Sequence, residues 1–188
     1  MSHIFISYRR QDAAAWAALL DKALRSRFAG AGLTVFFDTA STDLGEDYVH
    51  RVAEEVRSCD VLLALIGQHW LGRQGGRRRI DASDDLLRRE LLWALDAGVE
   101  IVPVFVDDAQ WSDVEPLPEE LRWFRRRHSA TIRRDEPGRD VVVLLDRLGI
   151  ELGLGAEADG SARPHEVNTH TYIETFNSRC GTHYFGGA

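Results

Sequence analysis

One glutamate near the middle of the sequence combines a reactive side chain with surroundings that do not suit a charge. Residues 84–98 read DDLLRRELLWALDAG, and at about 100° per residue their apolar side chains fall on one broad arc of a helix. That arc contains Leu86, Leu87, Leu91, Trp93, Ala94, Leu95 and Ala97. Asp85, Arg88, Arg89 and Asp96 gather on the opposite side, whereas Glu90 lies within the apolar arc. A carboxylate in that position can stabilise positive charge on a ligand.

Two interpretations of Glu90 are equally consistent with its spacing. Because burial of a bare carboxylate would cost several kcal/mol, the side chain must be paired, hydrogen-bonded or exposed in a cleft. It could form a structural ion pair with Arg9, Arg10 or an arginine of the 73–79 loop. Alternatively, it faces a ligand, because its place near the start of the helix brings it close to the ligand edge of the predicted sheet.

The elements that must position Glu90 alternate regularly between strand and helix. Short runs rich in Val, Ile, Leu and Phe predict buried parallel strands at 3–7, 34–37, 61–66 and 101–106, with a weaker fifth strand at 130–132. Helical periodicity separates them, and a closing helix is predicted at 140–148 after Pro137 and Gly138. The fold class is therefore α/β: a flavodoxin-like, doubly wound parallel five-stranded sheet of order 2-1-3-4-5 with flanking helices.

In such a sheet, ligands bind beyond the carboxyl ends of the strands, where the strand order reverses. That point lies between the first and third strands. The loops there are 8–12, 38–47 and 67–85, which are rich in Arg, Asp and Gly. We therefore expect one working edge of the sheet.

Composition narrows the class of protein. The chain of 188 residues is 44% apolar and 28% charged, and no apolar run approaches the roughly 18 residues that span a bilayer. With no leader-like segment before the first strand, a cytoplasmic protein without membrane contact is expected. The net charge of −7 makes nucleic-acid binding an unlikely function. Cys59 and Cys180 show no metal-ligand spacing, so no metal is predicted.

Five segments in order resemble bacterial members of the Toll/interleukin-1 receptor (TIR) family. They are FISYRRQD, GLTVFFD with the following TASTDLGEDY, CDVLLALIGQHWL, DLLRRELLWALDAG and IVPVFV, and the resemblance covers roughly residues 1–150. In the NAD-cleaving branch of that family, the catalytic residue is a glutamate on this helix. The resemblance therefore implies that Glu90 is catalytic and that NAD+ is the substrate, with no further cofactor. The family's pattern around this glutamate resembles Asp, aromatic, Val, Arg, any residue, Glu, and residues 85–90 match it from Asp85 to Glu90. Leu86 is the one departure, since an aromatic residue is common there.

The resemblance also implies substrate-binding roles for residues around the ligand edge. The ring of Tyr8 would stack on a base or on nicotinamide, and Arg9 or Arg10 would contact the diphosphate, unless these arginines have a surface or Asp12-paired role. Asp38 either contacts the ligand or caps its loop. Trp70 either lines the pocket or packs in the core. Residues 39–48 resemble the family's mobile loop over the substrate, with Gly45 suited to that movement, or they begin the next helix.

Three parts of the chain are predicted: a TIR domain over 1–151, a flexible linker over 152–164 and a short tail over 165–188. The tail alternates polar with β-branched or aromatic residues, which suits contact between copies or with a receptor or sensor protein; a disordered appendage is the alternative.

Two functions remain in competition. The first is an NAD+ glycohydrolase or ADP-ribosyl cyclase that releases nicotinamide, acts in antiphage or stress signalling and is activated by self-assembly. The second is a non-catalytic TIR adaptor that works through homotypic contacts. The presence of Glu90 and of the polar 8–10 segment favours the enzyme.

Overall fold

Five parallel strands form the centre of the protein in the computed structural model, which describes residues 1–37 and 46–154. The strand order is β2-β1-β3-β6-β7, and every neighbouring pair is parallel. The strands are β1 (Ser2–Ser7), β2 (Leu33–Phe37), β3 (Val61–Ile66), β6 (Glu100–Val106) and β7 (Ala130–Ile132). Counted along the chain this is the order 2-1-3-4-5, so the predicted flavodoxin-like doubly wound sheet is confirmed.

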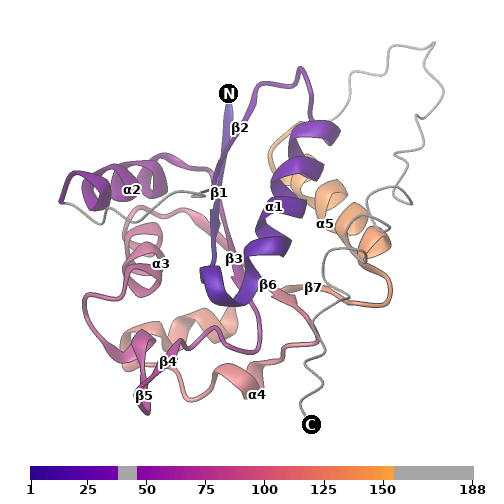
Figure 1. Cartoon of the computed structure of the whole chain (residues 1–188). Coiled ribbons are helices and arrows are strands. Elements are labelled where there is room, and N and C mark those ends of the chain that lie inside the picture. The colour runs from indigo at the N-terminus through magenta and orange to yellow at the C-terminus, as the bar shows by residue number, and fades with distance from the viewer. Residues whose placement is uncertain (38–45, 155–188) are drawn as a thin grey trace, which may run out of the picture.

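Helices cover both faces of the sheet, as Figure 1 shows. One face carries α1 (Arg10–Arg27) and α5 (Pro137–Glu151), and the other carries α2 (Glu46–Ser58) and α3 (Leu86–Asp96). All six residues of β3 are buried, because this strand lies between two neighbours and beneath two helical layers. Among the described residues, none of the helices has the length and apolarity needed to cross a bilayer.

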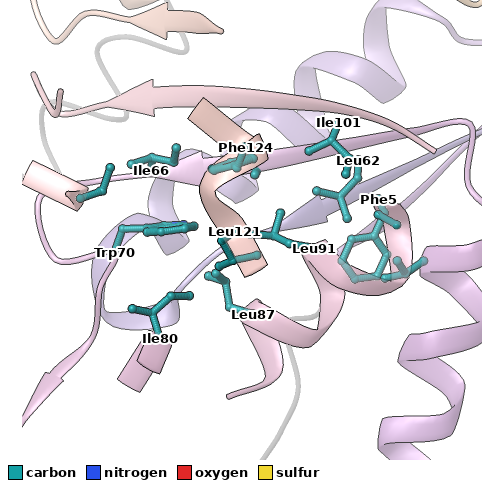
Figure 2. Close-up of a cluster of buried hydrophobic side chains, with 14 of the residues drawn as sticks. Phe5, Leu62, Ile66, Trp70, Ile80, Leu87, Leu91, Ile101, Leu121 and Phe124 are labelled. Atoms are coloured by element: carbon teal, nitrogen blue, oxygen red, sulfur yellow. The ribbon is translucent and has the colours of Figure 1, made fainter. Parts of the chain in front are cut away.

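Between β3 and α3 the chain makes contacts that the sequence did not reveal. Residues 73–81, which the sequence placed within a loop, form the short antiparallel strands β4 (Arg73–Gln74) and β5 (Arg77–Arg78), followed by the 3-10 turn η1 (Arg79–Asp81). Ile80 is fully buried and packs in the same apolar cluster as Leu87 and Leu91 of α3 (Figure 2). Burial of this one side chain fixes an otherwise polar segment against the domain.

Two polar residues at the start of α3 are buried. Asp85 is 4% exposed and Arg88 8% exposed. The segment between β6 and β7, which includes α4 (Trp111–Val114) and η2 (Glu119–Arg126), explains part of this burial, since Arg88 pairs with Glu120 of η2. Arg88 also donates to the carbonyl of Asp81 at 2.8 Å. Asp85 and Arg88 are thus buried in ion pairs, whereas Asp96 in the last turn of the helix is exposed.

The last helix continues three residues further than expected and ends in a left-handed glycine. Gly153 has φ +62°, and the amides of Gly153 and Leu154 donate to the carbonyls of Ile150 and Gly149 at 3.2 and 2.8 Å. This is a Schellman motif, which favours glycine because other residues are strained there. Leu152 and Leu154 pack against the core, so the predicted linker cannot begin at 152. The rest of the linker and the tail lie outside the described residues.

Candidate active site

A cavity of about 200 Å³ opens between β1, α2 and α3, close to the point where the strand order reverses. Of the eight residues that the sequence proposed for a site, five line it: Tyr8, Arg9, Arg10, Leu86 and Glu90. They come from the end of β1, the start of α1 and the first turns of α3. The predicted working edge of the sheet therefore carries a cavity.

Glu90 is held at the cavity wall by a hydroxyl group from the central strand. It is 8% exposed, and its Oε2 accepts a hydrogen bond of 2.5 Å from Ser7 Oγ. Ser7 is the last residue of β1, whereas Glu90 is the fifth residue of α3. The apolar residues Leu87 and Leu91 anchor α3 on the sheet (Figure 2), so the glutamate is turned toward the end of β1.

Arg9 and Asp85 form a buried ion pair beside the cavity. Nη1 and Nη2 of Arg9 donate to the two carboxylate oxygens of Asp85 at 3.1 and 3.2 Å, and Nε donates to the carbonyl of Trp70 at 2.7 Å. Asp85 is also the N-cap of α3, because its Oδ1 accepts from the amide of Arg88 at 3.2 Å. All three guanidinium nitrogens of Arg9 are thus engaged by the protein, which favours a structural role over the predicted contact with a diphosphate.

Gly72 makes room for the Arg9 side chain. Its φ is +64°, and a Cβ atom there would lie 2.7 Å from Arg9 Cζ. A larger residue would therefore be strained in its backbone and would push the guanidinium away from Asp85.

Tyr8 and Arg10 also line the cavity. Tyr8 is half-buried, with its ring centroid 6.1 Å from that of Phe37 at the end of β2. Arg10, the first residue of α1, is exposed. Aromatic rings and guanidinium groups are side chains that bind bases and phosphates.

Trp70 does not line the cavity. It is fully buried and stacks on Phe124 of η2 with centroids 5.8 Å apart and an interplanar angle of 10°, as Figure 2 shows. The packing interpretation of this residue is therefore the one that fits. Asp38 and Gly45 lie outside the described residues.

The cavity includes residues that the sequence did not assign to the site. Tyr48 of α2, Arg79 of η1 and Asp85 line it, and Ser7 holds Glu90 from behind. The Arg79 side chain is 52% exposed, and its Nε lies 3.6 Å from Asp85 Oδ2. Asp85 could have been found from its place in the pattern around Glu90. Nothing in the spacing distinguishes Ser7 or Tyr48 from ordinary core and helix residues.

A second carboxylate fixes the start of α1 to the loop after β3. Asp12 accepts hydrogen bonds from the backbone amides of Gly67 at 2.9 Å and His69 at 2.7 Å. Burial raises the pKa of this carboxyl above its ordinary value, although the two amides and the nearby His69 and Arg9 oppose the shift. A Cβ atom on Gly67 would lie 2.5 Å from Asp12 Oδ1, so any larger residue at this position would force the Asp12 side chain to move.

This geometry defines the class of protein. It is a doubly wound α/β domain with a cavity near the point where the strand order reverses. Within that class, the TIR domain family matches residues 4–143, which is most of the chain. The chain therefore belongs to the TIR domain family, as the resemblance in the sequence predicted.

The chain is similar to several known proteins at low sequence identity. The NAD(+) hydrolase sarm1 of Drosophila melanogaster is 28% identical over 121 residues, which is 63% of this chain and 8% of that protein. The chain thus spans only a small part of this curated relative. A prokaryotic SEFIR domain has 15% identity and a TM-score of 0.47, covering 78% of this chain and 97% of the other. The TIR domains of the activated Roq1 resistosome have 14% identity and a TM-score of 0.44, covering 96% and 99%.

Proposed function

We propose that this TIR domain cleaves the bond between nicotinamide and ribose in NAD+, with Glu90 as the catalytic residue. The observation that carries the proposal is the placement of the Glu90 carboxylate in the wall of a cavity that also presents Tyr8 and Arg10. The sequence likeness to a protein named NAD(+) hydrolase supports the same reaction.

One carboxylate is enough for this chemistry. Nicotinamide in NAD+ is a cationic pyridinium and a good leaving group, so the main task is to stabilise an oxocarbenium-like transition state and to hold the ribose. The C1′–N bond breaks, and its electron pair leaves with the nicotinamide nitrogen. Water or a nucleophile of the ADP-ribose itself then attacks C1′ and loses a proton, which gives linear or cyclic ADP-ribose.

The cavity is too small to enclose the whole dinucleotide. Pockets that enclose a drug-sized ligand measure roughly 300–1,000 Å³, whereas this cavity measures about 200 Å³. In the proposal, the nicotinamide ribose occupies the cavity beside Glu90, and the diphosphate and adenosine extend over the rim, where Arg10 and Arg79 carry positive charge. NAD+ is the substrate and no other cofactor takes part.

The biological setting belongs to the same proposal. Nicotinamide release in a cytoplasmic TIR protein would serve antiphage or stress signalling, either by depletion of NAD+ or through a nucleotide product. Activity would depend on self-assembly through TIR–TIR contacts, and the 165–188 tail would provide contact with a receptor or sensor protein.

The test is to incubate concentrated protein with NAD+, with and without a crowding agent, and to resolve the products by chromatography. Wild type is expected to release nicotinamide together with an ADP-ribose product, and Glu90→Ala is expected to release none. Light scattering on the same samples establishes whether the protein has assembled. Absence of nicotinamide from assembled wild type would contradict the enzyme and favour the adaptor.

A further inference from the structure

The contact between Ser7 and Glu90 joins two side chains that are 83 residues apart in the sequence. Ser7 is 1% exposed and Glu90 8% exposed, so water competes little for either group. The 2.5 Å distance from Ser7 Oγ to Glu90 Oε2 is in the range of a hydroxyl that donates to a charged carboxylate, roughly 2.5–2.7 Å.

Ser7 is the polar exception on a strand that is otherwise apolar from Ile4 onward. Residues 4–6 of β1 are Ile, Phe and Ile, each at most 2% exposed. Ser7 pairs in register with Ala64 of β3. Alanine would fill such a packing position equally well, and a buried hydroxyl is costly unless it has a partner. The hydroxyl therefore requires an explanation, and the Glu90 carboxylate is the partner that the structure shows.

We propose that Ser7 is the positioning residue for Glu90. Its hydroxyl donates to one carboxylate oxygen, which fixes the rotation of the carboxylate at the cavity wall and stabilises the charged form in which it can meet a developing oxocarbenium ion. This proposal rests on the NAD+ cleavage proposed above. Ser7 acts through Glu90 and does not itself contact the substrate.

Fixed orientation matters here because the carboxylate must be ready before the reaction begins. A side chain that rotates or moves by about 1 Å can cost on the order of 100-fold in rate. Since the Ser7 backbone belongs to the central sheet, its hydroxyl is a more rigid anchor than a surface side chain. The other ionisable groups that line the cavity, namely Tyr8, Arg9, Arg10, Tyr48, Arg79 and Asp85, remain unchanged when Ser7 is replaced.

The kinetic experiment compares Ser7→Ala and Ser7→Thr with wild type in nicotinamide release from NAD+. Ser7→Ala is expected to lower kcat by roughly 10- to 100-fold while KM stays within about threefold, because the binding groups on the rim are untouched. Ser7→Thr keeps the hydroxyl and is expected to recover most of kcat. Equal kcat in Ser7→Ala and wild type would overturn the proposal, and so would an equal loss in Ser7→Thr and Ser7→Ala with unchanged fold by circular dichroism.

A second measurement does not depend on catalysis. NMR of protein labelled with 13C at the glutamate carboxyl carbons follows the titration of Glu90 without NAD+, and Glu90→Gln identifies its signal. In Ser7→Ala the Glu90 midpoint is expected at a higher pH than in wild type, because the charged form has lost a donor. An unchanged midpoint would overturn the role of Ser7 even in an active enzyme. A shifted midpoint in a protein that releases no nicotinamide would instead contradict the proposed function alone.

Should Ser7→Ala fail to fold, Ser7→Cys provides the test at nearly the same size. A thiol is a weaker hydrogen-bond donor than a hydroxyl. The kcat of Ser7→Cys should therefore lie below that of Ser7→Thr, but above the value expected when residue 7 donates no hydrogen bond. Its Glu90 midpoint should likewise lie at a higher pH than in Ser7→Thr, but below the pH expected without a donor. Wild-type values for Ser7→Cys in both measurements would contradict the proposal.

Discussion

Arg9 donates two hydrogen bonds to Asp85, at 3.1 and 3.2 Å, and Asp85 is the N-cap residue of α3. The loop between β1 and α1 thereby fixes the start of the helix that carries Glu90. Two residues before Arg9, Ser7 holds Glu90 itself. The carboxyl end of a single strand thus positions both ends of the 85–90 segment.

The ion pair between Arg9 and Asp85 predicts a large loss of stability when one partner is removed. Arg9→Met leaves the Asp85 carboxylate, whose side chain is 1% exposed, with the Arg88 amide at 3.2 Å and the more distant Arg79 guanidinium at 3.6 Å. Loss of one partner from a buried pair costs about 3–5 kcal/mol, and we expect a decrease of this size in the free energy of unfolding. Urea denaturation measures it, with Arg10→Met as the matched control because Arg10 is exposed.

The double variant Arg9→Met/Asp85→Leu separates charge from packing. It removes both charges together, so it should be more stable than Arg9→Met alone. If Arg9→Met unfolds at the same urea concentration as Arg10→Met, the ion pair does not hold α3 in place.

Arg10 and Arg79 are predicted to act on substrate binding and not on stability. Both line the cavity, and the Arg79 side chain is 52% exposed. If they attract the diphosphate of NAD+, Arg10→Ala and Arg79→Ala should each raise KM several-fold with little change in kcat. The effect should shrink as salt is added, because salt screens exposed charges. Initial rates of nicotinamide release at two ionic strengths test this, and a fall in kcat at constant KM would contradict it.

Replacement of Gly67 by a residue with a side chain is predicted to lower the stability of the protein. A Cβ atom would lie 2.5 Å from Asp12 Oδ1, and Asp12 would have to move away from the two amides that it accepts. Gly67→Ala should therefore lower the free energy of unfolding by about 1–3 kcal/mol. Thermal and urea denaturation provide the measurement. Stability equal to that of wild type would show that Asp12 can move without loss.

The raised pKa of Asp12 predicts a specific dependence of stability on pH. Burial raises this pKa above 3.8 in the folded protein, so the folded state holds the proton more tightly than the unfolded state does. The contribution of Asp12 to stability is therefore fully present below pH 3.8 and is lost as pH rises through the raised pKa. Relative to Asp12→Asn, wild type should lose stability as pH rises through this window and show a constant difference above it.

Asp140 should behave in the opposite way and so serves as the contrast. Its side chain accepts from both the backbone amide and the guanidinium of Arg133, and these hydrogen bonds hold its pKa below 3.8. Its contribution is present above pH 3.8 and is lost as pH falls through the lowered pKa. Urea denaturation of Asp12→Asn, Asp140→Asn and wild type across the acidic range tests both signs, and parallel curves for the three proteins would contradict them.

The strands and the strand order could be predicted because each rests on a local signal. The run Val61–Ile66 has six consecutive apolar residues, and the structure confirms both of its ends. Glu90 was identifiable because one charge interrupted an apolar arc. These are properties of neighbouring residues, which periodicity captures.

What could not be predicted depends on contacts between distant parts of the chain. Asp85 and Arg88 lie on the polar side of a helical wheel, yet both are buried because Arg9 and Glu120 arrive from other segments. In the sequence, Ser7 resembles any small residue at the end of a strand. Its role becomes visible only from its contact with Glu90, which lies 83 positions further along the chain. Leu152 and Leu154 pack, partly buried, against the core, although the composition after Gly149 indicates a linker. Such pairings are set by tertiary packing, which spacing does not encode.

The rate of nicotinamide release by Glu90→Gln at saturating NAD+ tests directly whether Glu90 is the catalytic residue. Glutamine preserves the size of the side chain but removes its charge, and calorimetry with NAD+ establishes that the variant still binds. We expect the kcat of Glu90→Gln to be at least about 100-fold below that of wild type, with NAD+ binding retained. A Glu90→Gln protein that releases nicotinamide at the wild-type rate would contradict the account.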